Sequence, residues 1–201
     1  MKLTRLEKAF VNGRRQAENN IRIVERLFGQ IDLDKVKDVL EVGCGIGVVA
    51  AHLAQRYGWN VTGIDLDSEQ IERARNDNPE NEHLKFLEAD ATGLPFEDRE
   101  FDVVLSLNVL HHVPDWSAVL AEAGRVLRPE GLYVLYDFGL PGPRFAARIF
   151  KYAAFGADDI IDCLSRDAFE IVCAENPGAG IFTILPRQFS VVSRKAPADC
   201  L

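Results

Sequence analysis

The chain has 201 residues, of which 47% are apolar and 27% are charged, a mix typical of one globular domain with a sizeable core. No apolar run approaches the ~18 residues that a membrane span needs, and the net charge of −8 disfavours binding to nucleic-acid phosphates. We therefore expect a single domain over residues 1–201, no transmembrane segment and no nucleic-acid partner.

The start of the chain carries charged residues but no apolar h-region, so we expect no signal peptide and a cytoplasmic protein. Its four cysteines are not spaced as metal ligands, and we expect them to be reduced thiols. Side chains of neighbouring residues diverge on a helix or a strand, so the adjacent His111 and His112 do not predict a metal site either.

Short apolar runs alternate with amphipathic stretches through the middle of the chain. The apolar runs predict five strands, at residues 38–42, 61–65, 84–88, 101–107 and 132–136. The stretches between them predict three helices: 48–57, 69–76 with Ser68 as N-cap, and one that is capped by Asp115, runs through Leu127 and ends at Pro129 and Gly131. This alternation indicates a mostly parallel sheet with helices on both faces.

The two ends of the chain depart from this alternation. Residues 16–28 predict an amphipathic helix before the first strand, and residues 138–165 are expected to be loop and helix. Two further strands, 169–173 and 189–193, are separated by turns that contain Gly and Pro, which favours a hairpin.

A glycine-rich segment, Glu41-Val42-Gly43-Cys44-Gly45-Ile46-Gly47, lies where the first strand meets the helix that follows it. Such a turn lets the backbone approach a ligand, and the helix N-terminus offers free N–H donors. The loop of a dinucleotide-binding dehydrogenase would place its third glycine at Val48, one residue after Gly47. The alternative interpretation is a tight turn without a ligand.

Polar residues follow the next three strands. Asp65 ends the second strand, where a carboxylate can accept both hydroxyl hydrogens of a ribose; alternatively it is a helix N-terminal charge beside Asp67. Asp90 and Ala91 follow the third strand, where a carboxylate can accept the exocyclic amine of adenine, and Asn108 follows the fourth. The carboxyl ends of parallel strands share one edge of the sheet, so these residues predict a ligand crevice.

In this order the segments resemble the class I S-adenosylmethionine-dependent methyltransferases, and most closely the small-molecule group that includes the quinone-biosynthesis enzymes. The resemblance covers residues 37–137, about half of the chain, with a weaker similarity at residues 189–195. It is carried by residues 40–47, 63–65, 90–91, 94–96, 101–104, 108–115 and 125–131. It implies a Rossmann-like seven-stranded sheet, mostly parallel with the last strand antiparallel, and S-adenosylmethionine as cofactor.

The resemblance also implies which residues hold the methionine part of the cofactor. Gly43, Gly45 and Gly47 would shape the bed for it, with Glu41 near its ammonium group. Asn108 would offer its backbone to the same amine.

The same resemblance implies a second set of residues for the nucleoside part. Asp65 would hold the ribose hydroxyls, and Leu66 would lie against the adenine. Asp90 and Ala91 would contact the adenine edge.

A sulfonium is already a strong methyl donor, so alignment of the two reactants carries much of the rate. A base is needed only if the accepting atom must lose a proton. His111 is the candidate, because it follows the fourth strand near the expected methyl group; the alternative is a packing or helix-capping histidine. Tyr136 and Asp137 end the fifth strand and could also line the site.

Specificity is expected to come from residues 1–30 and 138–165, which lie outside the shared core. We expect residues 138–165 to form a substrate lid, with a helix from Arg144 to Phe155 that Gly156 ends. Its aromatic residues are candidates for an apolar acceptor pocket or for core packing: Phe138, Phe145, Phe150, Tyr152 and Phe155. Its basic stripe is a candidate for an anionic substrate, a membrane surface or a solvated face: Arg144, Arg148 and Lys151.

The expected function is therefore methyl transfer to a small, partly apolar acceptor. Two other classes remain open: a non-catalytic regulatory domain with a methyltransferase-like fold, and an NAD-dependent oxidoreductase. The intact glycine loop and both acidic positions argue against the first, and Val48 at the third glycine position argues against the second.

Overall fold

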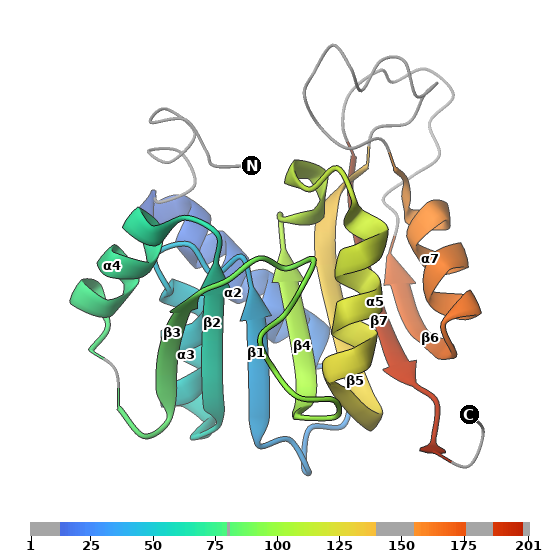
Figure 1. Ribbon diagram of the computed structural model, residues 1–201, viewed down its shortest axis with the longest axis horizontal. Helices are drawn as coiled ribbons and strands as arrows, with labels where there is room; N and C mark the ends of the chain where they lie inside the picture. Colours follow the sequence, from blue (N-terminus) through green and yellow to red (C-terminus); the bar gives the residue numbers. More distant parts are fainter. Residues whose placement is uncertain (1–12, 80, 140–154, 176–186, 199–201) are drawn as a thin grey trace.

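A computed structural model describes residues 13–79, 81–139, 155–175 and 187–198. Seven strands form one sheet in the order β3-β2-β1-β4-β5-β7-β6 (Figure 1). The strands are β1 (Asp38–Val42), β2 (Asn60–Asp65), β3 (Leu84–Glu88), β4 (Phe101–Leu107), β5 (Leu127–Gly139), β6 (Phe169–Glu175) and β7 (Arg187–Lys195). The first five run parallel, and β7 runs antiparallel to β5 and β6. The predicted sheet and the predicted hairpin are confirmed.

Helices cover both faces of the sheet (Figure 1). Val39 of β1 belongs to the core layer under α2 (Arg14–Phe28), α3 (Val48–Tyr57) and α4 (Ser68–Asp77). Leu40 and Val42 belong to the opposite layer, under α5 (Trp116–Val126) and α7 (Ala157–Arg166). Burial on both faces explains why β1 and β4 are largely apolar runs in the sequence. Among the described residues, no helix has the length and apolar character to cross a bilayer.

The caps of two helices were predicted, and one prediction is wrong. Asp115 caps α5, as expected, by accepting a hydrogen bond from the backbone N–H of Ala118 at 3.2 Å. For α4 the cap is Asp67, whose carboxylate accepts from the N–H of Glu69 at 3.1 Å, whereas Ser68 is already the first helical residue. Both residue types cap well, so the local sequence did not distinguish them.

Strand β5 begins earlier than predicted. The helix expected to run through Leu127 ends at Val126, and Leu127 already pairs with Phe101 of β4. The next paired residues are Val103 and Leu132, so the register between β4 and β5 shifts at this point. Pro129 and Gly131, predicted to end the helix, therefore lie in an irregular section of the strand, in which Glu130 has a φ of 64°.

Segment 138–165 is described only in part. Gly156 does not end a helix but is the N-cap of α7, with extended backbone at φ −120°. Phe155, one of the aromatic residues considered for an acceptor pocket, is 1% exposed and packs between the rings of Trp116 and Phe189. The remaining expected lid residues, from Arg144 to Tyr152, lie outside the described residues.

Candidate functional site

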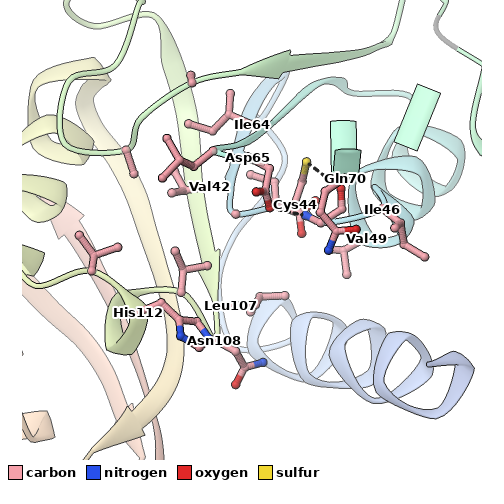
Figure 2. A pocket seen from close by; sticks show the side chains of 18 of the residues that line it. Val42, Cys44, Ile46, Val49, Ile64, Asp65, Gln70, Leu107, Asn108 and His112 are labelled. Atoms are coloured by element: carbon pink, nitrogen blue, oxygen red, sulfur yellow. Dashed lines mark hydrogen bonds between the residues drawn. The ribbon is translucent and has the colours of Figure 1, made fainter. Parts of the chain in front are cut away.

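A cavity of about 380 Å³ opens at the carboxyl ends of β1, β2 and β4 (Figure 2). Most of the predicted cofactor residues line it: Glu41, Gly43, Gly45, Asp65, Leu66, Asp90, Ala91 and Asn108. Gly47 and the candidate base His111 are not among the lining residues. Strands that are far apart in the sequence meet here because a parallel sheet brings all their carboxyl ends to one edge.

The glycine loop turns sharply from β1 into α3. Gly43, Gly45 and Gly47 all have positive φ, at 70°, 53° and 75°. Gly47 is needed for packing as well, because a Cβ at this position would lie 2.5 Å from the ring of Phe86. The loop therefore approaches β3 closely at Gly47 and faces the cavity at Gly43 and Gly45.

Asp65 fixes the loop from the end of β2. Its Oδ2 accepts a hydrogen bond from the N–H of Gly45 at 3.0 Å, and its Oδ1 accepts from the N–H of Asp67 at 2.9 Å. Burial raises the pKa of this carboxyl above its usual value. An ionised carboxylate has about four lone-pair directions, so Asp65 keeps acceptor capacity for ligand hydroxyls in the cavity.

Glu41 is a buried carboxyl in the cavity wall, only 3% exposed. Its Oε2 has no hydrogen-bond partner within the described part of the chain. Desolvation raises the pKa of Glu41 to about 8; the N–H of Ala50 at the start of α3 opposes this shift, and the charge of Asp65 adds to it. A buried acceptor of this kind fits a cationic donor.

The outer part of the cavity is more exposed. Leu66 is 39% exposed and offers an apolar surface on which a flat ring could lie. Asp90 Oδ1 accepts from the N–H and the hydroxyl of Thr92 at 2.9 and 2.8 Å, and these hydrogen bonds lower the pKa of Asp90. Asp90 is thus an oriented carboxylate at the rim.

Asn108 lies in the turn after β4 with a φ of 58°, a conformation rare for residues other than glycine. Its N–H donates to the carbonyl of Tyr136 at 2.7 Å, and its Nδ2 donates to Oδ1 of Asn20 at 3.4 Å. Figure 2 shows the Asn108 side chain reaching toward the helix below it, α2.

Helix α2, part of the segment 1–30 that was expected to contribute to specificity, forms one wall of the cavity, although none of its lining residues was predicted. Gln16, Ala17 and Asn20 line the cavity, and Gln16 Nε2 donates to Asn20 Oδ1 at 3.1 Å. The signal in the sequence was an amide pair spaced i, i+4, next to the predicted apolar face. Gln70, which is buried in α4, and His112 also line the cavity without having been predicted.

His111 lies behind the cavity wall. Its Nδ1 is 2.5 Å from Oδ1 of Asp137, a carboxylate with no exposed surface. Asp137 also accepts from the N–H groups of Val109, Leu110 and Phe138, at 3.1, 2.7 and 2.6 Å. One buried carboxylate therefore fixes the turn after β4 and the ring of His111.

Of four side chains near that turn, one lines the cavity and three do not. The rings of His111 and His112 are 3.9 Å apart, and His112 is the one that lines the cavity. Tyr136 and Asp137, which the sequence analysis considered as lining residues, are not among those of this cavity.

The charge of the cavity restricts what it can bind. Four carboxyl groups line it, from Glu41, Asp65, Asp90 and Asp115, and no Lys or Arg does so among the described residues. Such a wall attracts a cationic ligand and repels the pyrophosphate of a dinucleotide. S-adenosylmethionine carries a sulfonium and an ammonium group, so the residues present fit it.

Comparison with known proteins agrees with this geometry. A family model described as a methyltransferase domain matches residues 40–135. The chain is 41% identical over 131 residues to 27-O-demethylrifamycin SV methyltransferase of Amycolatopsis mediterranei, covering 63% of this chain and 48% of that protein. It is 36% identical over 182 residues to fatty-acid O-methyltransferase of Mycolicibacterium smegmatis, covering 89% of this chain and 62% of that protein. The chain thus spans roughly half to three fifths of these relatives.

Solved structures show the same architecture. Geranyl diphosphate C-methyltransferase from Streptomyces coelicolor A3(2), in complex with Mg²⁺, geranyl diphosphate and S-adenosyl-L-homocysteine, superposes with a TM-score of 0.74. The superposition covers 90% of this chain and 80% of that one at 13% identity, so the likeness concerns the fold. The matched segment, the strand order and the position of the cavity together show that the chain belongs to the class I S-adenosylmethionine-dependent methyltransferase family.

Proposed function

We propose that the chain binds S-adenosylmethionine in the cavity at the carboxyl edge of the sheet and transfers its methyl group to a small, partly apolar acceptor. The observation that carries this proposal is the cavity wall itself, which contains four carboxyl groups, one of them Glu41 with its unpaired Oε2, and no Lys or Arg among the described lining residues. When bound, the cofactor supplies an electrophilic methyl group on a sulfonium. Every other requirement falls on residues of this chain.

The binding roles follow from where each side chain lies. Glu41 accepts from the ammonium group, and Asp65 accepts from the ribose hydroxyls while it holds Gly45. Leu66 packs against the adenine ring, and Asp90 accepts from its amine at the rim. These contacts hold the methyl carbon at a fixed place near the turn after β4, and that placement supplies much of the catalysis.

His111 is the proposed base, with Asp137 as its positioning residue. Because Nδ1 donates to the buried carboxylate, the remaining nitrogen, Nε2, is the basic one. The ring lies beside His112, a residue of the cavity wall, and against Phe138 at the end of β5, with ring centroids 5.4 Å apart. This place suits an acceptor whose reacting atom loses a proton, such as a hydroxyl oxygen. The two curated relatives compared above both act on oxygen according to their names.

The alternatives are each opposed by an observation. An oxidoreductase that binds NAD would have to place a pyrophosphate beside Glu41 and Asp65, which costs electrostatic energy. A non-catalytic domain of the same fold would have no need for a buried carboxylate that orients a histidine beside the cavity.

The test has two parts. Calorimetry with S-adenosylhomocysteine and with NADH measures which ligand the cavity takes; we expect binding of the first only. Transfer of a labelled methyl group from the cofactor to a metabolite extract then reveals an acceptor, with His111→Gln as the inactive comparison. Tight binding of NADH without binding of S-adenosylhomocysteine contradicts the proposal. Binding of S-adenosylhomocysteine without methyl transfer to any component of the extract supports the non-catalytic regulatory alternative.

A further inference from the structure

Two buried oxygens in the cavity lack hydrogen-bond partners within the described part of the chain: Glu41 Oε2 and Asn108 Oδ1. They come from neighbouring strands, since β1 pairs with β4 and Asn108 directly follows β4. Buried acceptors without a donor are costly and rare in folded proteins. Two of them in one cavity indicate a ligand with several N–H donors.

The orientation of the Asn108 amide is set by its neighbours. Asn20 Oδ1 receives donors from Gln16 Nε2 and Asn108 Nδ2, at 3.1 and 3.4 Å. The nitrogen of the Asn108 amide is therefore committed to α2, and its oxygen is the atom left for a ligand. Both amides on α2 are neutral, so they orient Asn108 without adding charge to the cavity.

The charged groups around Glu41 leave its carboxylate without compensation. Asp65 contributes a second negative charge from β2, and Asp90 and Asp115 contribute two carboxylates at the rim. Cys44 contributes a buried thiol. His112 is the one side chain of the described lining that could become a cation. Helices α2, α3 and α4 contribute amide and apolar side chains to the lining and no charged ones.

An ionised Glu41 would thus be a buried charge without a counterion beside another carboxylate. Proteins avoid that arrangement by holding a proton on one of the two groups. Consistent with this, burial and the charge of Asp65 raise the pKa of Glu41 to about 8.

We propose that Glu41 holds a proton in the ligand-free cavity and loses it when a primary ammonium group docks between Glu41 Oε2 and Asn108 Oδ1, so that cofactor binding releases a proton. The inference rests on the proposed function and adds a specificity mechanism to it. The O–H bond of Glu41 breaks, the proton goes to the buffer, and the ligand keeps its ammonium charge. A protonated Glu41 next to a ligand without that charge stays protonated.

The proposal fixes the sign of a pH effect. Below about pH 8, the free protein must give up a proton to bind, so affinity for a ligand with an ammonium group rises as pH increases, by up to roughly tenfold per unit. Affinity for a ligand without this group shows no such rise from Glu41.

The experiment is calorimetry of S-adenosylhomocysteine at pH 7 in phosphate and in Tris, whose heats of ionisation differ. The difference in apparent enthalpy gives the number of protons released, and a group with a pKa near 8 predicts about 0.9 per ligand. The matched ligand is 5′-methylthioadenosine, which has the same nucleoside and sulfur but no amino-acid part. We expect it to bind without proton release, and neither measurement requires a variant.

Two variants identify the source of the proton. Glu41→Gln is expected to abolish the release, and His112→Asn is expected to leave it in place. Release that survives in Glu41→Gln and disappears in His112→Asn overturns the proposal, as does binding of S-adenosylhomocysteine with no release at all. Failure of S-adenosylhomocysteine to bind the natural protein is a different result, because it overturns the proposed function itself.

Discussion

The Nδ1 of His111 lies 2.5 Å from Oδ1 of Asp137, and this carboxylate is completely buried while three backbone N–H groups also donate to it. A side chain held in this way has one fixed orientation and one fixed tautomer. The pair lies immediately behind the wall of the cavity, since the ring of His111 contacts the ring of His112, which lines it, with centroids 3.9 Å apart.

If His111 is the base, His111→Gln should reduce methyl transfer by roughly 10²–10⁴-fold. Its affinity for S-adenosylhomocysteine should stay unchanged, because His111 does not line the cavity. Asp137→Asn should lose activity as well, since an amide cannot accept from all four donors and disturbs the tautomer. Rates of labelled methyl transfer, with ligand affinity and melting temperature as controls, check this. Full turnover in His111→Gln would show that His111 has a packing role and is not the base.

Asp65→Ala should weaken binding of S-adenosylhomocysteine by roughly 10- to 150-fold, the loss expected for hydrogen bonds to a charged group worth ~1.5–3 kcal/mol. Asp65→Asn is the matched control, since it preserves the size and one oxygen near Gly45. The dissociation constants are compared by calorimetry in variants with a native-like melt. An unchanged constant in Asp65→Ala would limit Asp65 to holding the loop.

Gly47→Ala and Gly58→Ala separate the cost of a left-handed backbone conformation from the cost of steric overlap. Both glycines have similar φ, 75° and 69°, but a Cβ at Gly47 would meet Phe86 at 2.5 Å, whereas nothing lies within 4 Å at Gly58. The left-handed conformation alone should cost Gly58→Ala ~1–2 kcal/mol of unfolding free energy. Gly47→Ala should lose a further ~1–3 kcal/mol from overpacking. Equal losses in urea unfolding would disprove the close approach.

The ligand-free protein should lose stability as pH rises from 5 to 8. The pKa of Glu41 in the folded state, about 8, is above its ordinary value of 4.5, so the folded state binds the proton more tightly than the unfolded state does. The contribution of this proton to the free energy of unfolding is complete at low pH and disappears as pH increases through 8. The free energy of unfolding then falls by at most ~1.4 kcal/mol per pH unit. Glu41→Gln should flatten this slope in urea titrations at several pH values. Identical slopes in both proteins would refute the raised pKa.

The expected lid can be tested against a core residue of the same segment. Phe155→Ala should cost ~3–5 kcal/mol of stability, because its ring is buried between Trp116 and Phe189. For Phe145→Ala and Tyr152→Ala we expect weakened turnover with little change in melting temperature or cofactor affinity. If these two variants melt as early as Phe155→Ala and retain normal kinetics below the melt, the lid hypothesis fails.

The sequence by itself determined the sheet and the edge of the sheet at which the cavity lies. Strands β1, β3 and β4 were predicted with their observed bounds. In β1 and β4 the signal was a largely apolar run, because these strands are buried on both faces of the sheet. In the edge strand β3 only Leu84 and Phe86 are buried. Glu41 and Asp65 could be placed in one crevice because the carboxyl ends of parallel strands always meet at one edge.

The tertiary structure decided what depends on contacts between distant residues. Whether Asp67 or Ser68 caps α4, and where β5 begins, follow from neighbouring strands and helices rather than local propensity. The sequence pointed to the His pair, but only the turn after β4 puts His112 in the cavity wall and His111 on Asp137, 26 residues away. The raised pKa of Glu41 likewise exists only once β1, β2 and α3 enclose the carboxyl, because desolvation is a property of the packed chain.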